Sequence, residues 1–134
     1  MEPPSKYESD SARAPHRILI VDDDAESADS LAMLLQAPGH RETRVAYSAG
    51  AALALAVEFQ PTIVFLDVEL PDMSGYEVAR RLHQHPRLQN RRLIALTDSG
   101  EHPGRELARE AGFERYLLKP VTGVALEELL SMPQ

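Results

Sequence analysis

Four short apolar runs constrain the fold of this chain more than any other feature of its sequence. Each run is continuous rather than alternating, which is typical of strands covered on both faces, as in a parallel sheet. The runs lie at Ile18–Val21, Ile63–Leu66, Leu93–Leu96 and Tyr116–Leu118. A weaker run at Arg44–Tyr47 alternates polar and apolar residues and predicts an edge strand.

The segments between these runs repeat apolar residues at helical spacing, and Ser74 followed by Glu77 is a capping-box pattern at the start of one of them. The apolar positions of the predicted helices are Ala28, Leu31, Leu34 and Leu35, then Ala51, Leu55 and Phe59, then Val78, Ala79 and Leu82, then Leu107 and Ala111, and finally Leu126, Leu129 and Leu130. Strands that alternate with helices predict an α/β fold with a doubly wound open sheet of five strands and five helices.

Length and composition indicate one domain and exclude several classes of partner. The 134 residues suffice for a single domain, expected over residues 16–134, after a proline- and serine-rich flexible tail at residues 1–15. A formal charge of −7 argues against direct binding of nucleic acid or of an anionic membrane. Without cysteines, a membrane-length apolar run or a signal peptide, the chain is expected to be cytoplasmic.

Each strong apolar run is followed at once by a residue type that carries chemistry. Asp22 and Asp23 follow the first run, Asp67 the second, Thr97 the third and Lys119 the fourth. Ligands bind outside the carboxyl ends of the strands in open parallel sheets. These residues, far apart in the sequence, are therefore predicted to converge on one pocket.

The residue types in this predicted pocket form a coherent chemical set. Crowded carboxylates repel one another, and a bound cation relieves the repulsion. Oxygen ligands without sulfur favour a hard cation, and we expect Mg²⁺, or Mn²⁺ in its place. Beside such a cation Asp67 can attack phosphorus and form an aspartyl phosphate. Lys119 can pair with one oxygen of the transferred group, and Thr97 can donate a hydrogen bond to another.

Four segments around these residues carry a family resemblance. They read Ile18-Leu-Ile-Val-Asp-Asp-Asp, Phe65-Leu-Asp-Val-Glu-Leu-Pro-Asp-Met-Ser-Gly, Ala95-Leu-Thr and Tyr116-Leu-Leu-Lys-Pro. In this order and at this spacing they resemble the receiver domains of response regulators in two-component signalling, over a stretch from Arg17 to Leu130. The resemblance implies a flavodoxin-like fold with a five-stranded parallel sheet in the order 2-1-3-4-5.

The resemblance also implies a role for the acidic residues. Asp67 would accept a phosphoryl group from a histidine kinase or a histidine phosphotransfer domain. Asp22 and Asp23 would bind the metal ion together with Asp67 and the backbone carbonyl of Glu69. The chain would then be a phosphorylatable signalling domain rather than an enzyme, catalysing only its own phosphorylation and dephosphorylation.

Further roles are implied at the third and fourth strand ends. Thr97 and Tyr116 would be a switch pair that moves when the phosphoryl group arrives, and Lys119 would bind that group. The face near Tyr116 is the expected surface for a homodimer or a downstream effector. The Lys119–Pro120 peptide bond is expected to be cis, which would aim the lysine back into the pocket.

Two acidic residues depart from the family pattern. Asp98 follows the switch threonine, where the family usually has a small residue, and Glu69 lies two residues beyond Asp67, at a position that the family varies. Both place negative charge near an anionic product. We expect Asp98 to shorten the lifetime of the phosphorylated state through like-charge repulsion.

Three other readings of the sequence compete with a receiver. Asp22 to Asp24 also fit the Asp-x-Asp motif of haloacid-dehalogenase-type phosphatases, in which Asp22 would be the nucleophile, but the acidic pair expected after Lys119 is missing. A degenerate receiver that acts only through protein interactions is disfavoured because all five kinds of site residue are present. A dinucleotide-binding fold is disfavoured because no Gly-x-Gly-x-x-Gly follows the first strand. As a simpler alternative, Asp22 to Asp24 would only cap the following helix, a role that we expect for Asp24.

Overall fold

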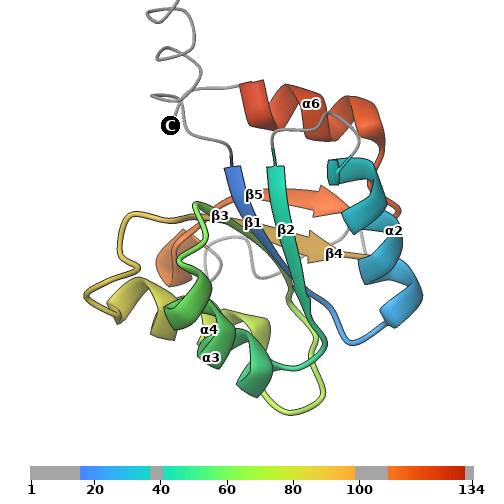
Figure 1. Cartoon of the computed structure of the whole chain (residues 1–134). Coiled ribbons are helices and arrows are strands. Elements are labelled where there is room, and N and C mark those ends of the chain that lie inside the picture. The colour runs from blue at the N-terminus through green and yellow to red at the C-terminus, as the bar shows by residue number, and fades with distance from the viewer. Residues whose placement is uncertain (1–15, 37–40, 99–108, 132–134) are drawn as a thin grey trace, which may run out of the picture.

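One parallel sheet of five strands forms the centre of the molecule (Figure 1). The computed structural model describes residues 16–36, 41–98 and 109–131. The strands are β1 (His16–Val21), β2 (Arg41–Ala46), β3 (Ile63–Asp67), β4 (Arg92–Thr97) and β5 (Phe113–Leu118). They pair in the order β2-β1-β3-β4-β5, which confirms the expected topology.

Helices cover both faces of this sheet, with α3 and α4 on one face and α2 and α6 on the other (Figure 1). The described helices are α2 (Ala25–Gln36), α3 (Ala49–Phe59), α4 (Gly75–Gln84) and α6 (Gly123–Ser131). Residues 109–111 are also helical, at the end of the helix predicted around Leu107 and Ala111, whereas Leu107 lies outside the described residues.

The two hydrophobic cores use alternate residues of the same strands. Leu19, Val64 and Ala95 pack on the α3 and α4 side, whereas Ile20 and Ile94 pack on the α2 and α6 side. Because both faces of the sheet are buried, β1, β3 and β4 need apolar side chains at successive positions. This is the reason for the continuous runs in the sequence.

The last strand departs from this pattern. Phe113 is buried in β5, but Glu114, Arg115 and Leu118 are exposed, and Leu118 keeps 54% of its accessible surface. β5 forms one edge of the sheet. Tyr116 packs against one core and Leu117 against the other, so the expectation that Tyr116–Leu118 would be covered on both faces holds for these two residues and was wrong for Leu118. β2 lies at the opposite edge, as predicted, although it spans Arg41–Ala46 rather than Arg44–Tyr47.

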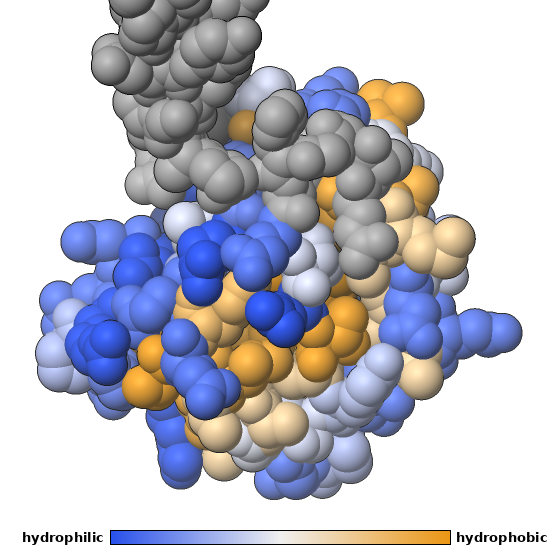
Figure 2. Space-filling view, in the orientation of Figure 1, coloured by the Kyte–Doolittle hydropathy of each residue, from blue (hydrophilic) through white to orange (hydrophobic). Residues whose placement is uncertain are grey.

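Among the described residues, the predicted helical faces agree with the structure except at two exposed positions, Ala51 of α3 and Leu34 of α2. In α4 the predicted residues Val78, Ala79 and Leu82 are all buried. α3 is apolar nearly all round, and apolar surface gathers over its part of the molecule in Figure 2. Its buried residues are Ala49, Ala52, Ala56 and Phe59. Of the predicted positions, Phe59 is buried, Leu55 is half-buried against the core, and Ala51 is exposed, so only Ala51 was wrong. Leu34 of α2 is also 42% exposed rather than part of the core.

The predicted caps are partly confirmed. Asp24 caps α2 by accepting a hydrogen bond from the Glu26 backbone N–H at 3.1 Å. Ser74 caps α4, since its Oγ accepts from the Tyr76 N–H at 3.1 Å. The second arm of the capping box is absent, because the Glu77 carboxylate pairs with Arg81 at 3.0 Å instead of returning to Ser74. None of the helices among the described residues has the length and apolar character to cross a membrane.

Candidate functional site

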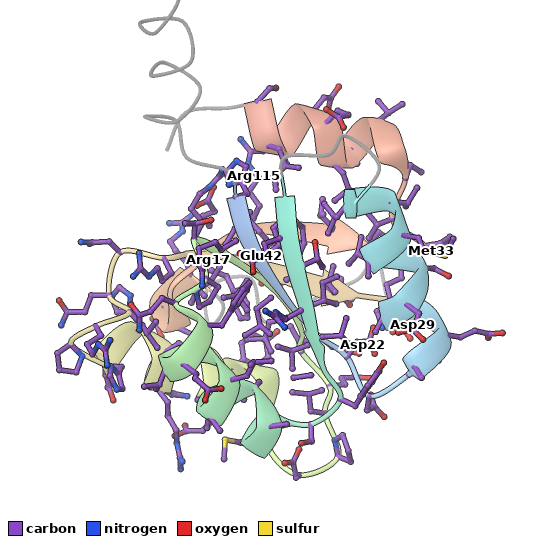
Figure 3. All side chains as sticks on the ribbon, in the orientation of Figure 1. Arg17, Asp22, Asp29, Met33, Glu42 and Arg115 are labelled. Atoms are coloured by element: carbon purple, nitrogen blue, oxygen red, sulfur yellow. The ribbon has the colours of Figure 1, made fainter. Side chains whose placement is uncertain are left out.

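The carboxyl ends of four parallel strands meet at one edge of the sheet. Asp22 follows β1, Asp67 ends β3, Thr97 ends β4 and Lys119 follows β5. Backbone pairing continues to these positions, since the Lys119 N–H donates to the Thr97 carbonyl at 2.8 Å. Figure 3 shows Asp22 at this end of β1, whereas Arg17 and Glu42 lie toward the opposite end of their strands.

Lys119 links two of the carboxylates. Its Nζ lies 2.7 Å from Asp22 Oδ2 and 2.9 Å from Asp67 Oδ2. Asp22 and Asp67 are both buried, with 1% and 7% of their surface exposed. The lysine therefore offsets part of the repulsion between two anionic groups that have little access to water.

Each buried carboxylate contacts Lys119 through its Oδ2 atom and accepts a backbone hydrogen bond at its Oδ1 atom. Asp22 Oδ1 accepts from the Asp24 N–H at 3.0 Å, an Asx-type turn that leads directly into α2. Asp67 Oδ1 accepts from the Glu69 N–H at 2.8 Å in the same i to i+2 arrangement. Each strand end thus fixes the direction of its own aspartate.

The pKa values reflect this crowding. Burial raises the pKa of Asp67 to about 6, with a smaller contribution from the charge of Asp22, although the Glu69 N–H and Lys119 act in the opposite direction. Burial by itself would lower the pKa of Lys119, but its contacts with Asp22 and Asp67 outweigh that effect and raise it. The site is therefore short of positive charge at neutral pH.

The donor set fits a hard cation. Oxygens of Asp22, Asp23 and Asp67 all lie within 4.8 Å of one another, and Asp23 is exposed, which leaves a path from solvent. Asp22 Oδ2 is buried and, apart from its ion pair with Lys119, has no aligned hydrogen bond among the described residues. Carboxylates that are close together and incompletely paired suit Mg²⁺ or a similar cation.

A glycine sets the course of the loop that follows Asp67. A Cβ atom on Gly75 would lie 2.3 Å from the Asp67 carbonyl oxygen and 2.6 Å from Val68 Cα, distances that no side chain can accept. The Gly75 N–H also donates to the Val68 carbonyl at 3.0 Å. The start of α4 therefore packs directly on the backbone of the candidate phosphoacceptor.

The predicted switch residues lie beside this centre. Thr97 is buried at the end of β4, and Tyr116 is half-buried in β5. Tyr76 of α4, which the sequence analysis did not identify, packs edge-on against Phe113 at 6.0 Å between ring centroids. Burial raises the pKa of Tyr76 to about 12, with further contributions from the nearby Tyr116 and from a hydrogen bond between the two side chains.

Two further expectations concern the segments that flank the site. The Lys119–Pro120 peptide bond is cis, as predicted. Asp98 is exposed. Its side chain thus has access to water, and the predicted effect on the phosphorylated state stays a prediction.

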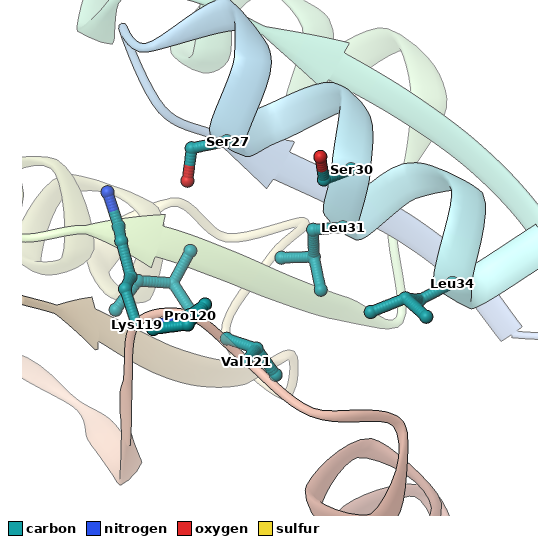
Figure 4. Close-up of a pocket in the computed structure, with 8 residues that line it drawn as sticks. Ser27, Ser30, Leu31, Leu34, Lys119, Pro120 and Val121 are labelled. Atoms are coloured by element: carbon teal, nitrogen blue, oxygen red, sulfur yellow. The ribbon is translucent and has the colours of Figure 1, made fainter.

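A small cavity opens beside Lys119, between α2 and the segment after β5 (Figure 4). Its volume is about 80 Å³. The lining residues are Ser27, Ser30, Leu31, Leu34, Leu96, Lys119, Pro120 and Val121. Its lining is mainly apolar, and Lys119 is the charged residue among the lining residues.

Asp72 is a second residue that the sequence analysis did not single out. It lies in the loop after Asp67 and accepts hydrogen bonds from the Ala49 and Gly50 N–H groups at the start of α3. The sequence held one sign of this contact. The first turn of α3 has no acidic residue of its own, so its free N–H groups favour an acidic residue from elsewhere in the chain. The pairing between Tyr76 and Tyr116, by contrast, has no signature in the sequence.

Comparison with known proteins gives a consistent result. The family model of the response regulator receiver domain matches residues 18–131. The polar-differentiation response regulator DivK of Brucella anthropi is 31% identical over 108 residues, which cover 81% of this chain and 87% of DivK. The crystal structure of a CheY-like response regulator receiver domain protein from Methanospirillum hungatei superposes with a TM-score of 0.79 at 31% identity, covering 87% of this chain and 91% of that one.

Other relatives are longer than this chain. The DNA-binding dual master transcriptional regulator RpaA of Synechocystis is 32% identical over 115 residues. The match covers 86% of this chain but 46% of RpaA. The chain thus spans about half the length of that regulator.

Proposed function

This chain belongs to the response regulator receiver domain family, and on that premise we propose that Asp67 accepts a phosphoryl group from a histidine kinase or a histidine phosphotransfer domain in a Mg²⁺-dependent reaction. The protein is then a phosphorylatable signalling domain that catalyses only its own phosphorylation and dephosphorylation. The proposal implies a cytoplasmic location.

The observation that carries the proposal is the double contact of Lys119. One ammonium group reaches both Asp22 and Asp67 within 2.9 Å, in a site where a third carboxylate, Asp23, is close. A structural ion pair needs one carboxylate, and the surplus negative charge calls for a further cation. Asp22 and Asp67 both contact the lysine and both belong to the carboxylate cluster, and the family pattern assigns the phosphoryl group to Asp67.

The proposed reaction follows from these positions. An Asp67 oxygen attacks phosphorus, and the bond between phosphorus and the donor imidazole nitrogen breaks. The electron pair stays on that nitrogen, which takes a proton from water. Lys119 exchanges its contact with Asp67 for a phosphoryl oxygen. When bound, Mg²⁺ supplies positive charge at the phosphoryl oxygens. Asp22 and Asp23 would hold it with Asp67 and the Glu69 carbonyl.

The switch would begin at Thr97. Thr97 ends β4, where its hydroxyl would donate to a phosphoryl oxygen, and its movement would open space for Tyr116. The hydrogen bond between Tyr76 and Tyr116 would then have to break or change partner. A downstream effector or a second copy of the chain would read this change on the face near Tyr116.

The decisive experiment is phosphorylation with a small phosphodonor such as acetyl phosphate. We expect one phosphoryl group per chain on Asp67, located by mass spectrometry, with no modification of Asp67→Asn and none of the parent in a chelator. Asp29→Asn serves as a matched loss of an exposed carboxylate, whose contact is with Tyr47 outside the proposed site, and should still be modified. Phosphorylation of Asp22 instead would favour a phosphatase of the Asp-x-Asp type and overturn the assignment.

A further inference from the structure

The loop between β3 and α4, residues 68–74, is held by a contact that the proposed reaction does not use. The Asp72 carboxylate accepts hydrogen bonds from the backbone N–H groups of Ala49 at 3.0 Å and of Gly50 at 3.1 Å. These two bonds, the first of them most strongly, lower the pKa of Asp72. The side chain is therefore anionic at neutral pH and reaches the beginning of another element, α3.

α3 depends on this contact to complete its N-terminus. Its other early donors bond to Ser48, since the Ala51 N–H donates to Ser48 Oγ at 3.1 Å and the Ala52 N–H donates to the Ser48 carbonyl at 3.0 Å. A helix N-terminus favours an anion, because its first N–H groups are unpaired and its dipole is positive there. Asp72 supplies that anion from a different part of the chain.

The two ends of the loop are fixed independently of Asp72. At the start, the Val68 N–H donates to the Leu96 carbonyl at 3.2 Å, and at the end Gly75 packs on the backbone of Asp67. Leu70 and Met73 pack against the core between these ends, which places the loop without orienting its peptide groups. Within the described part of the chain, the hydrogen bonds that join residues 70–73 to another element come from Asp72 alone.

We propose that Asp72 is a positioning residue for the metal site, because tying the loop to α3 fixes the orientation of the Glu69 backbone carbonyl. This inference rests on the proposed function, which makes that carbonyl a metal ligand. We call the two hydrogen bonds from Ala49 and Gly50 to Asp72 the tether. Glu69 lies in the chain between Asp67 and Asp72, and its own N–H donates to Asp67 Oδ1 at 2.8 Å. Releasing the tether leaves that N–H contact in place but frees the peptide group that carries the carbonyl.

The first test is the dissociation constant for Mg²⁺, measured by isothermal titration calorimetry at 0.3 M salt to screen exposed charges. Asp72→Ala should bind Mg²⁺ about tenfold more weakly than the parent, the lower end of the effect of removing groups that orient metal ligands. Asp72→Asn keeps one acceptor oxygen and should lie between the two. Ser48→Ala is the matched control, since it weakens the same helix N-terminus without releasing the loop and should bind Mg²⁺ like the parent.

The second test uses the reciprocity of linked equilibria, by which Mg²⁺ must strengthen the tether if the tether strengthens Mg²⁺ binding. In amide hydrogen exchange, saturating Mg²⁺ should slow the exchange of the Ala49 and Gly50 N–H groups in the parent. The Ala51 N–H, which donates to Ser48, should change much less. In Asp72→Ala the Mg²⁺ effect on Ala49 and Gly50 should disappear.

Each remaining outcome has a definite meaning. Equal Mg²⁺ binding by Asp72→Ala and the parent would overturn the positioning role, while the parent's own binding would leave the proposed function standing. An Asp72→Asn variant as weak as Asp72→Ala would assign the effect to charge and also overturn it, as would equal weakening in Ser48→Ala. Failure of the parent itself to bind Mg²⁺ would overturn the proposed function.

Discussion

Asp67 carries a cost in stability that comes with its position. A buried carboxylate beside Asp22 is easier to keep neutral than charged, and burial raises its pKa from 3.8 to about 6. Between these two values the folded protein holds more protons than the unfolded chain, so this group makes stability fall as the pH rises. Above pH about 6 Asp67 is ionised in both states, and its unfavourable contribution to the free energy of unfolding no longer changes with pH.

Asp67→Asn should therefore stabilise the protein in the absence of metal. The gain in the free energy of unfolding should be about 1 to 2 kcal/mol at pH 7.5, less than the full pKa shift would give because Asn also loses the charged contact with Lys119. The difference between variant and parent should shrink as the pH falls from about 6 to 3.8, where the parent also becomes neutral. Urea unfolding in a chelator at several pH values measures this, and a gain independent of pH would refute the electrostatic cause.

Asp98 is a second acidic residue whose effect can be measured. It is exposed, so water and salt screen its charge from a phosphoryl group on Asp67. Asp98→Ala should lengthen the dephosphorylation half-life about twofold at low salt, which corresponds to less than about 0.5 kcal/mol. Asp98→Asn, which keeps the shape, should behave alike, and both effects should diminish at 0.5 M salt. An unchanged half-life in both variants would remove Asp98 from the account of phosphoryl lifetime.

The junction of β3 and α4 tolerates no side chain at its glycine. Gly75→Ala would place Cβ 2.3 Å from the Asp67 carbonyl oxygen, which forces the backbone apart. We expect a loss of about 3 kcal/mol in the free energy of unfolding and a parallel loss of Mg²⁺ binding. Gly123→Ala is the control, because no atom lies within 4 Å of its Cβ at the start of α6, and it should be neutral or stabilising by about 0.5 kcal/mol. Equal urea midpoints for the two variants would contradict the packing argument.

At the level of helices and strands, the sequence predicted most where one pattern excluded the alternatives. α4 alternates apolar and charged residues with helical period, and its buried face was predicted correctly. α3 offers no such contrast, since small apolar residues surround the helix, and only its packing against the sheet selects Ala52 and Ala56. β5 was recognised from its apolar end, but its edge position follows from the order of strands and not from its own residues.

For the molecule as a whole, metal binding should appear as added stability. If Mg²⁺ binds only the folded state, a concentration 100 times the dissociation constant adds about 2.7 kcal/mol to the free energy of unfolding. Asp23→Asn should abolish most of this gain, since Asp23 is one of the three clustered carboxylates. Asp24→Asn removes the same charge one residue away and keeps a good helix cap, so it should retain the gain. Equal gains in both variants would exclude Asp23 as a ligand.

The arrangement of the site could be anticipated from the sequence to the extent that it follows from parallel strands. Asp22, Asp67 and Lys119 each end an apolar run, and a parallel sheet brings such ends to one edge. The strand order itself came from the family resemblance, because apolar runs do not say which strands are neighbours. Asp72 and Tyr76 were missed for a related reason, since their partners are 20 or more residues away and are selected by the fold.

The order of the site residues along the chain also determines when the site can be completed during synthesis. The acidic residues Asp22, Asp23 and Asp67 precede Lys119 in the chain, and a chain is made from its N-terminus onward. Lys119 follows the final strand, 52 residues after Asp67. A growing chain that has not yet added β5 therefore holds clustered negative charge without its lysine. The ion pair that completes the site forms only when translation has passed the last strand and β5 has joined β4.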